Sequence, residues 1–399
     1  MADLEITAIC DLSFEKLNRA TKLLEEKGRP SPARYTDYHA MLREADLDAV
    51  VIMTGWNDRL SYAMDAMEAG KYTAIKVGCA YDISECYALV ETFERTGSPV
   101  MMLENCCYGR REMAALRMAK EGLFGEIVQC SGGYYHYLNN CELFLKKDDG
   151  TVDANHYRLE EYVRRNCDQY PTHELGPISK VLNINRGNRM LSLRSFTTKS
   201  VGLETYIREH VPEGHPHHGV KFRQGDIVTP LIECAGGEQI QLVLDTTLPR
   251  AFYSRGFTVR GTKGMCVESA ECACTFYTEG MPEGEAAFNN EMEWYKEHDH
   301  PLHAEYATQV RGGHGGMDLL VTRAFVESVK HGTQTPIDVY DTAAWLAIAP
   351  LSEASIAGGS IPVPVPDFTK GKWFRREPAV SGKYSLDAIC SDPDTPIYP

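Results

Sequence analysis

The sequence lacks a G-x-G-x-x-G motif and any apolar run near the roughly 20 residues that span a bilayer. It is also short of basic residues, with 41 Lys and Arg against 56 Asp and Glu and a net charge of −15. This imbalance argues against nucleic acid or an anionic membrane as the partner. What remains, 43% hydrophobic and 24% charged residues over 399 positions, is typical of a soluble globular protein with two domains.

The cysteines and the N-terminus indicate a reducing compartment. Thirteen cysteines are an odd number for a disulfide framework, and neither Cys106-Cys107 nor the pair Cys272 and Cys274 has the spacing of a zinc site. The histidines of GHPHHG and HDHPLH lie among Pro and Gly, as in exposed loops, so we expect no metal. The opening MADLEITAICDLSFEKL lacks the features of a signal peptide. We expect a cytoplasmic location, or export if a signal precedes Met1 in a longer natural chain.

The first hundred residues alternate strand and helix patterns. Four short apolar runs, EITAICD, LDAVVIMTG, YTAIKVG and PVMMLEN, are typical of parallel strands buried on both faces. Helical patterns separate them, and one of these ends at Gly70, which suits a helix C-cap. This rhythm predicts a doubly wound parallel sheet of the Rossmann type over residues 1–108.

From residue 109 the pattern changes to long β-type segments. A helix through RREMAALRMAKEG precedes EIVQCSGGYYHYL, MLSLRSFTTKSV, DIVTPLIECAGGEQIQLVLDTTL and RGFTVRGTKGMCVE. Long strands with Gly-Gly turns predict a mostly antiparallel sheet, and two helical patterns follow it. We therefore expect an α/β domain over 1–108, an α+β domain over 109–366 and a polar, extended C-terminal tail over 367–399.

Asp11 ends the first strand, where a doubly wound sheet can place an acid on the ribose of a dinucleotide. The glycine-rich turn that goes with such an acid should come about 20 residues earlier, and the printed sequence has no room for it. Two interpretations follow. Either the chain lacks its first strand, phosphate loop and helix, or the sheet never bound a dinucleotide and Asp11 is a solvated strand end.

The segment NCDQYPTHELGP places Tyr170 and His173 beside two prolines. A helical turn that begins at Pro171 would bring the two side chains to one face, and we expect Gly176-Pro177 to end that helix. On these residues alone, a buried turn with both rings bonded to backbone is the commoner explanation.

Several ordered motifs resemble those of a known family. They are R-N-x-D-x-Y-P-T-H-x-L-G-P at 165–177, MMLENCCYGRREM, GGYYHYL, DTTLPRAFYSRGFTVRGTKG and GGHGGMDLL. Between residues 5 and 366 the chain resembles the glucose–fructose oxidoreductase, inositol dehydrogenase and MocA superfamily (Gfo/Idh/MocA). Within it, the chain looks closest to glycoside hydrolase family 109, the NAD-dependent α-N-acetylgalactosaminidases. The resemblance implies a Rossmann-type domain that binds NAD, here expected to lack its first β-α unit, followed by a sugar-binding domain.

Carried over residue by residue, the resemblance implies two sets of contacts. NAD would meet Asp11 through its ribose, and also Trp56, Asn57, Asp58, Arg59, Lys76, Val77, Asn105 and Tyr170. The sugar pocket would be lined by Tyr134, Arg158, Tyr170, Pro171, Thr172, His173 and Tyr253. The chain departs from the family pattern at Arg59, where the family has histidine, and at Lys76, where it has an acid. Many superfamily dehydrogenases carry a catalytic lysine in E-K-P. Here Lys76 stands one position early, on the opposite strand face, which weakens a lysine-assisted dehydrogenase mechanism.

The implied reaction oxidises C3 of the sugar by hydride transfer to NAD⁺, removes the acidified C2 proton, expels the glycosidic oxygen, adds water and reduces C3 again. It needs two bases and a donor for the enolate, not the carboxylate pair of ordinary glycosidases. We expect His173 to act at C3, Tyr134 or Tyr170 at C2, and Arg158 on an anionic oxygen or a carbonyl.

Each of these residues also has a structural explanation when taken alone: sheet packing for Tyr134 and Tyr253, a surface charge for Arg158, and a solvated strand end for Glu104. The substrate would be a small or terminal sugar, by default an N-acetylhexosaminide. The alternatives are a plain NAD-dependent sugar or polyol dehydrogenase and a non-catalytic sugar-binding subunit. A homo-oligomer through the C-terminal sheet is a further expectation.

Overall fold

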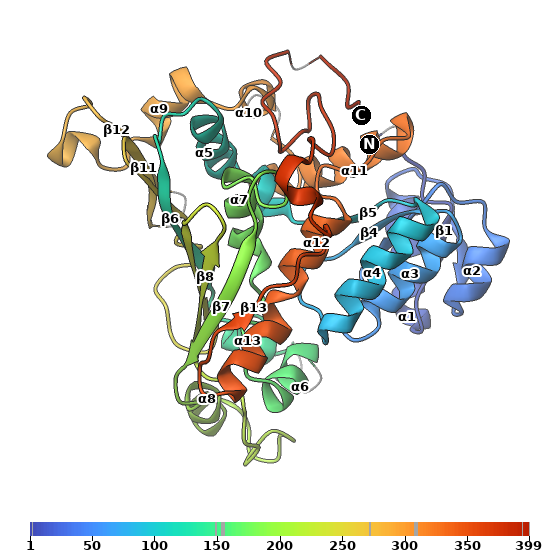
Figure 1. The fold of residues 1–399 in the computed structure, drawn as a ribbon. Helices are drawn as coiled ribbons and strands as arrows, with labels where there is room; N and C mark the ends of the chain where they lie inside the picture. The colour runs from blue at the N-terminus through green and yellow to red at the C-terminus, as the bar shows by residue number, and fades with distance from the viewer. Residues whose placement is uncertain are drawn as a thin grey trace.

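The computed structural model describes every residue except 2, 148–149, 153–155, 271–272, 307–309, 393 and 399, so Cys272 lies outside the described residues. The N-terminal elements, with helices α1 to α4, form one side of the molecule, and a large sheet forms the other (Figure 1). Helices α7, α12 and α13 lie between the two. None of the helices in the described part of the chain has the length and apolar character that a membrane crossing requires.

The N-terminal strands pair in parallel, as expected, but they form two separate sheets. Strand β1 (Ala8–Cys10) pairs with β2 (Ala33–Tyr35), and β3 (Ala49–Ile52), β4 (Tyr72–Ile75) and β5 (Val100–Met102) form the other sheet in that order. The two sheets approach where Thr7 donates a hydrogen bond to the Asp46 carbonyl at 3.4 Å. In the described structure β1 and β3 each keep one unpaired edge, and Val51 on β3 is 51% exposed.

Helices α1 (Phe14–Glu26), α2 (Tyr38–Glu44), α3 (Arg59–Glu68) and α4 (Ile83–Thr96) connect these strands. In helix α4, residues of the helix itself mark both its ends and its buried face. Asp82 and Glu85 form a capping box at its start, and Gly97 in the left-handed conformation ends it. Its buried residues, among them Cys86, Leu89 and Val90, lie on one face at helical spacing.

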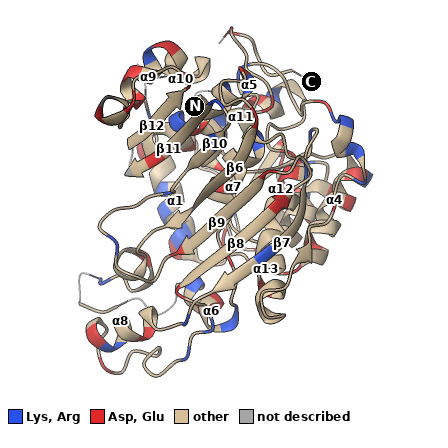
Figure 2. Ribbon diagram, turned by 60° about the vertical axis from the view of Figure 1, so that its left-hand side comes forward, with Lys and Arg blue, Asp and Glu red and all other residues tan. Residues whose placement is uncertain are grey.

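The second half of the chain forms an eight-stranded sheet in the order β12-β11-β10-β6-β9-β8-β7-β13. Among the strand pairs of this sheet that the structure describes, only β6 and β9 are parallel, so the expectation of a mostly antiparallel sheet is confirmed. Helix α7 packs against β6 and α13 against β7 on one face. Figure 2 shows the opposite face without a covering helix and with few charged residues along β6, β8 and β9. The strands are β6 (Ile127–Tyr135), β7 (Met190–Thr197), β8 (Ile227–Cys234), β9 (Gln239–Asp245), β10 (Thr258–Gly261), β11 (Gly264–Ala270), β12 (Ala273–Thr278) and β13 (Val363–Pro364).

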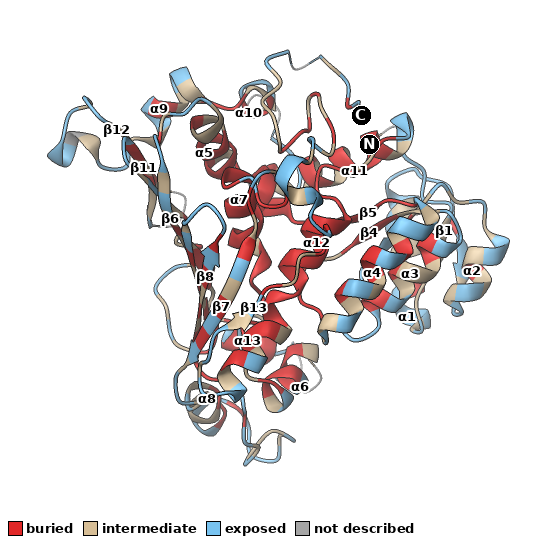
Figure 3. Ribbon diagram, in the orientation of Figure 1, coloured by how far each residue is buried: buried red, intermediate tan, exposed pale blue. Residues whose placement is uncertain are grey.

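The helices of this half are α5 (Arg110–Lys120), α6 (Tyr157–Arg164), α7 (Thr172–Val181), α8 (Gly202–His210), α9 (Glu291–His298), α10 (Pro301–Tyr306), α11 (Met317–His331), α12 (Val339–Leu346) and α13 (Ile348–Ala357). Helices α12 and α7 are buried almost throughout, whereas the outer faces of α1 to α4 are exposed (Figure 3). Trp345 on α12 is among the largest fully buried side chains of the core.

Two prolines shape these buried helices. The last helical pattern of the sequence divides at Ala347, because Pro350 cannot donate to the carbonyl of Leu346. That carbonyl accepts the amide of Ala80 at 3.3 Å instead and so joins α12 to the loop after β4. Pro177, in contrast, lies inside α7 and does not end it, so the expected stop at Gly176-Pro177 was wrong. Burial on several sides holds α7 through the proline, since it contacts β6, α5, α12 and the short helix at Asn105–Tyr108.

The expectation of exposed histidine loops was also wrong. In HDHPLH, Pro301 begins α10, and His300 and His303 are buried. His303 donates from Nε2 to the Tyr108 carbonyl at 2.8 Å, which docks α10 on the Asn105–Tyr108 turn. In GHPHHG, His217 is half-buried, with its ring centroid 6.4 Å from that of Phe144. Proline at a first helical position and aromatic packing explain both outcomes.

The C-terminal tail is irregular, as expected, but it is packed into the core. Val380, Leu386 and Ile397 are each at most 2% exposed. Asp387 pairs with Lys180 of α7 at 3.0 Å and with Arg186 at 2.8 Å. The tail therefore completes a buried charge cluster at the far end of the helix that begins at Thr172.

Candidate active site

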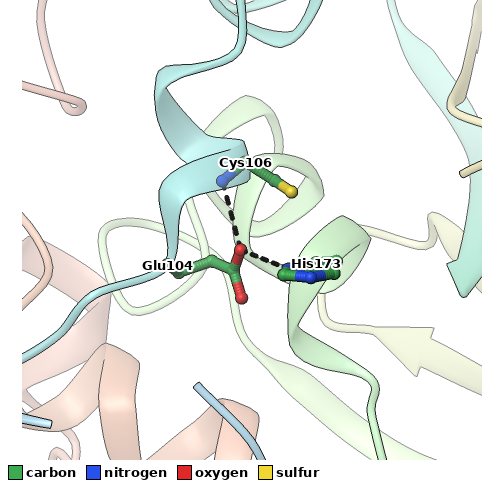
Figure 4. Close-up of side chains that lie close together, drawn as sticks. All are labelled: Glu104, Cys106 and His173. Atoms are coloured by element: carbon green, nitrogen blue, oxygen red, sulfur yellow. Dashed lines mark hydrogen bonds and ion pairs between the residues drawn. The ribbon is translucent and has the colours of Figure 1, made fainter. Parts of the chain in front are cut away.

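The site is organised around one contact between distant parts of the chain. Strand β5 leads into Glu104, and α7 begins with Thr172 and His173. Nδ1 of His173 lies 2.7 Å from Oε1 of Glu104, which also accepts the amide of Cys106 at 3.1 Å (Figure 4). Glu104 is fully buried, so the alternative of a solvated strand-end carboxylate does not hold.

The electrostatics of this pair favour a carboxylate that orients the imidazole. Burial by itself would raise the pKa of the Glu104 carboxyl, but His173 and the hydrogen bonds outweigh burial and hold that pKa below its ordinary value. An ionised carboxylate only accepts, so His173 donates from Nδ1 and its Nε2 is left to take up a proton. This is the arrangement of a general base with an orienting partner.

Two glycines make the close approach of α7 possible. A Cβ on Gly176 would lie 2.9 Å from Sγ of Cys107 and 3.0 Å from Cγ of Glu104. A Cβ on Gly132 of β6 would lie 2.6 Å from Cβ of Glu174. The glycines of THELGP and GGYYHYL therefore let the helix lie against both the Glu104 turn and the large sheet.

Aromatic rings surround the imidazole. The ring centroid of His173 is 4.8 Å from that of Tyr170 and 5.4 Å from that of Tyr134, and these two tyrosines are 4.6 Å apart. Tyr253 lies 6.1 Å from Tyr134. Burial raises the pKa of all three phenols, so each is a neutral donor or acceptor in the resting site. The residues expected to form the sugar pocket thus gather in one place.

Arg158 closes the same cluster from α6. Its guanidinium carbon lies 4.6 Å from the ring centroid of Tyr170, 5.4 Å from that of Trp56 and 5.8 Å from that of Tyr134. Its Nε lies 3.3 Å from Oε2 of Glu142. The side chain is buried, so Arg158 is not the surface charge that its helix neighbours suggested. A buried cation beside several aromatic rings can hold an anionic oxygen.

A second arginine, Arg255, connects the segments that surround the site. Arg255, from the motif FYSRGF, donates to Sγ of Cys106 at 2.7 Å and to Glu112 at 2.6 Å, and lies 3.0 Å from Glu174. Glu174 follows His173 in α7, and burial raises its pKa well above the ordinary value. These contacts join the loop before β10, the Cys106 turn and the start of α7 into one unit.

Glu104, Cys106 and His173 could be taken for a metal site, because their ligand atoms lie within 4.8 Å of one another (Figure 4). The chemistry does not fit. Metal binding needs a thiolate, whereas burial raises the pKa of the Cys106 thiol well above its ordinary value and the Arg255 guanidinium already donates to the sulfur. Glu104 is engaged by His173. We assign no metal to these three residues.

Some of the residues expected at the cofactor gather around Tyr157. Trp56, Asn57 and Asp58 line a cavity of about 140 Å³ together with Tyr157. Nζ of Lys76 lies 5.7 Å from the Tyr157 ring centroid, and burial together with Arg158 lowers the pKa of this lysine. The Trp56 ring is 6.2 Å from that of Tyr170, which connects this cavity to the tyrosine and histidine cluster.

Other cofactor candidates are engaged within the protein. Arg59 is fully buried and donates to the carbonyls of Val77 and Cys79 at 2.9 and 3.0 Å, so its guanidinium holds that loop. The Asn105 amide donates to Asp318 of the GGHGGMDLL motif at 2.6 Å. Asp11, on the separate two-stranded sheet, accepts the amide of Ser13 at 2.8 Å, and its carboxylate is 37% exposed.

Sequence reasoning missed four residues of the site. Glu104 was weighed as a solvated strand end, and Glu142, His136 and Asp168 were not singled out. Asp168 accepts the amide of Tyr170 at 3.1 Å, and His136 contacts the Tyr134 hydroxyl. Strand alternation held a usable signal for His136, because residues two apart on a strand share a face. No local signal connects Glu104 to His173.

Comparison with known proteins places this geometry in a family. Residues 108–375 match the C-terminal domain of glycosyl hydrolase 109. The chain is also 38% identical over 393 residues to the alpha-N-acetylgalactosaminidase of Tannerella forsythia, covering 94% of this chain and 83% of that protein. The chain belongs to glycosyl hydrolase family 109. A family 109 protein of Stenotrophomonas maltophilia (strain K279a) is 38% identical over 403 residues, covering 96% of this chain and 88% of that protein.

Solved structures share the fold of this family 109 protein. A levoglucosan dehydrogenase in complex with NADH and levoglucosan superposes with a TM-score of 0.62 and 16% identity, covering 91% of this chain and 90% of that one. An NAD-binding oxidoreductase from Klebsiella pneumoniae gives a TM-score of 0.66 and 15% identity, covering 91% and 90%. The expected combination of a Rossmann-like part and an α+β part is thereby confirmed.

Proposed function

We propose that this family 109 protein is an NAD-dependent glycosidase that releases a terminal N-acetylhexosaminide by transient oxidation of the sugar at C3. The observation that carries the proposal is the Glu104–His173 pair, which meets Tyr134, Tyr170 and Arg158 in one buried cluster. The cluster offers bases and a cation for proton transfers next to a carbonyl. Of the carboxylates in the site, Glu104 is bonded to His173, Glu142 lies beside Arg158 and Asp168 accepts the Tyr170 amide, so none of them forms the acid and nucleophile pair that direct hydrolysis requires.

The residues present fit the two ends of NAD. Trp56, Asn57 and Asp58 line one cavity with Tyr157, and Nζ of Lys76 lies 5.7 Å from the Tyr157 ring centroid. The Asp11 carboxylate follows a parallel strand, where such acids meet a ribose. The printed sequence holds no glycine-rich turn for the pyrophosphate. When bound, NAD would supply the acceptor and donor of the hydride at C3.

The roles of the chain's own residues follow from their positions. His173, with Nδ1 held by Glu104, takes the proton of the C3 hydroxyl on Nε2 and returns it when the alcohol is restored. Tyr134 or Tyr170 exchanges the C2 proton, and Arg158 stabilises the negative charge on the enolate oxygen. Pro171, Thr172 and Tyr253 shape the pocket, since the first two precede His173 and the third contacts Tyr134.

Turnover in heavy water tests this proposal. With NAD⁺ and p-nitrophenyl N-acetyl-α-galactosaminide in D₂O, we expect release of the sugar with deuterium at C2 and no accumulation of NADH. Accumulation of NADH without cleavage would support a sugar dehydrogenase instead. Cleavage without label at C2 would exclude the redox route.

Two further properties belong to the same proposal. We infer a homo-oligomer through the uncovered sheet face, supported by the exposed Phe196 of β7 and by the scarcity of charge along β6, β8 and β9 (Figure 2). We also infer a cytoplasmic location, supported by cysteines that are free throughout the described part of the chain and mostly buried. Sedimentation velocity tests the first inference, and cell fractionation tests the second.

A further inference from the structure

A buried tyrosine needs help to act as the base at C2. Burial raises the pKa of Tyr134, and Glu142 raises it further, although Arg158 lowers it. The phenol is therefore protonated at neutral pH. It can accept a proton from carbon only if its own proton leaves at the same time, so a second acceptor must contact its oxygen.

His136 provides such an acceptor. Its Nδ1 lies 2.9 Å from the Tyr134 hydroxyl oxygen, and the two ring centroids are 5.4 Å apart. Tyr134 belongs to β6, and His136 follows one residue after the strand ends, so the alternation of the strand brings the two to one face. The His136 amide donates to the Asp245 carbonyl at 3.0 Å, which fixes the backbone beside β9.

The other nitrogen of His136 leads toward the surface. Its Nε2 lies 3.8 Å from Sγ of Cys141, and Cys141 is exposed. The ring of Tyr253 packs on the imidazole at 5.0 Å and holds its plane. A proton received at Nδ1 can thus be balanced by loss of one from Nε2 at the half-buried rim of the site.

Tyr170, the other candidate base, lacks this connection. Its hydroxyl makes no hydrogen bond with the part of the chain that the structure describes, and its ring lies under the Arg158 guanidinium at 4.6 Å. A cation over the ring positions Tyr170 for stacking and for holding charge, not for passing a proton outward.

We propose that His136 is the positioning residue that turns Tyr134 into the C2 base and relays its proton to solvent. The inference rests on the proposed function and specifies one of its steps. As the C2–H bond of the 3-keto sugar breaks, its proton passes to the Tyr134 oxygen, the phenolic proton passes to Nδ1 of His136, and the electron pair stays in the enolate. His136, then an imidazolium, loses the Nε2 proton to water. The oxidised sugar is the product of the nicotinamide-dependent step, and this step needs no further oxidant.

The test supplies the oxidised sugar directly. A 3-keto N-acetylgalactosaminide is incubated with the protein in D₂O without NAD, and exchange of the C2 hydrogen is followed by NMR. We expect His136→Ala to slow the exchange by roughly 10²-fold, within the range of general acid–base catalysis, with unchanged sugar affinity by calorimetry. Added imidazole should restore most of the rate in His136→Ala but none in Tyr134→Phe.

Two further variants test whether slow exchange in His136→Ala comes from lost proton transfer or from a disturbed fold. His136→Gln can still bond to the phenol but cannot be protonated, so it should stay as slow as His136→Ala while keeping the wild-type melting temperature. His218→Ala removes a histidine that bonds to the Val211 carbonyl and should exchange at the wild-type rate. Equal exchange in wild type and His136→Ala, or no response to imidazole, overturns the relay alone. A wild-type protein that exchanges no C2 hydrogen overturns the proposed function as well.

Discussion

Glu104 and His173 are 69 residues apart in the chain, yet Oε1 of the first lies 2.7 Å from Nδ1 of the second. One residue closes a parallel strand and the other opens a buried helix, so the pair joins the two halves of the molecule. Because the carboxylate is buried and ionised, it fixes which nitrogen of the imidazole faces the pocket. Several experiments follow from this contact and its surroundings.

Replacing His173 with alanine should reduce turnover by roughly 10²–10⁴-fold, because the C3 hydroxyl loses its proton acceptor. Sugar affinity, measured by calorimetry, should change little, since Tyr134, Tyr170 and Arg158 remain. His331→Ala, which alters only a half-exposed histidine near Glu327, is the matched control. Near-normal turnover in His173→Ala would return this histidine to a packing role.

Replacing Glu104 with glutamine should lower kcat by at least about tenfold. The loss should be smaller than the roughly 10²–10⁴-fold loss expected when the general base itself is removed. The amide can still accept the Cys106 N–H, but it carries no charge to support a protonated His173. The melting temperature, measured with kcat, separates the two effects. A stable variant with wild-type kcat would show that the carboxylate only packs against the imidazole.

Gly176→Ala should destabilise the fold by about 1–3 kcal/mol, because the new methyl group would overpack the Cys107 and Glu104 side chains. It should also lower kcat, since α7 must move away from Glu104. Urea unfolding together with kinetics measures both. Gly55→Ala is the stability control, because a Cβ there would meet no atom within 4 Å. If Gly176→Ala leaves both quantities unchanged, the close approach is not needed.

The raised pKa of the buried Asp168 carboxyl should make the free energy of unfolding depend on pH. Burial raises its pKa from 3.8 to about 7, so the folded state keeps a proton that the unfolded chain releases. This acid therefore costs stability as pH rises from about 4 to above about 7. Asp168→Asn resembles the protonated acid, and the variant should gain stability relative to wild type over that range, by more than about 1 kcal/mol. Urea unfolding at several pH values measures this, and a constant difference would contradict it.

The unpaired edges of β1 and β3 predict the effect of an added strand. A β-α unit with a glycine-rich turn, fused ahead of Met1, should raise both the melting temperature and the affinity for NAD, because it could pair with both sheets and cradle the pyrophosphate. Changing the glycines of that unit to valine should keep the gain in stability and abolish the gain in affinity. No change in either quantity would show that the gap between the sheets takes no strand.

Residues with local signals were predictable, and those that depend on distant contacts were not. Asp82, Glu85 and Gly97 mark the ends of α4 by themselves, and the apolar runs of β3 to β5 identify buried parallel strands. The order of motifs placed Tyr134, Tyr170 and His173 in one site. The prediction that Pro177 ends a helix was wrong, because burial of α7 overrides the tendency of proline to break helices.

The same reasoning explains the misjudged side chains. From the sequence, Glu104 resembles a solvated strand end and His303 a loop residue. In the fold, Glu104 is buried under α7, and Nε2 of His303 donates a hydrogen bond to the Tyr108 carbonyl. The separation of β1 from β3 in the described structure depends on pairing across the fold, which composition and periodicity do not report.

The buried C-terminal tail supplies a contact to α7 that forms late in synthesis. Lys180 lies in the last turn of the helix that carries His173 in its first turn, and its partner Asp387 lies 207 residues later in the chain. While the chain is being synthesised, Lys180 and Arg186 lack one of their acidic partners until Asp387 emerges. A nascent chain that stops short of Asp387 therefore lacks one of the buried acids that hold the far end of the helix carrying His173.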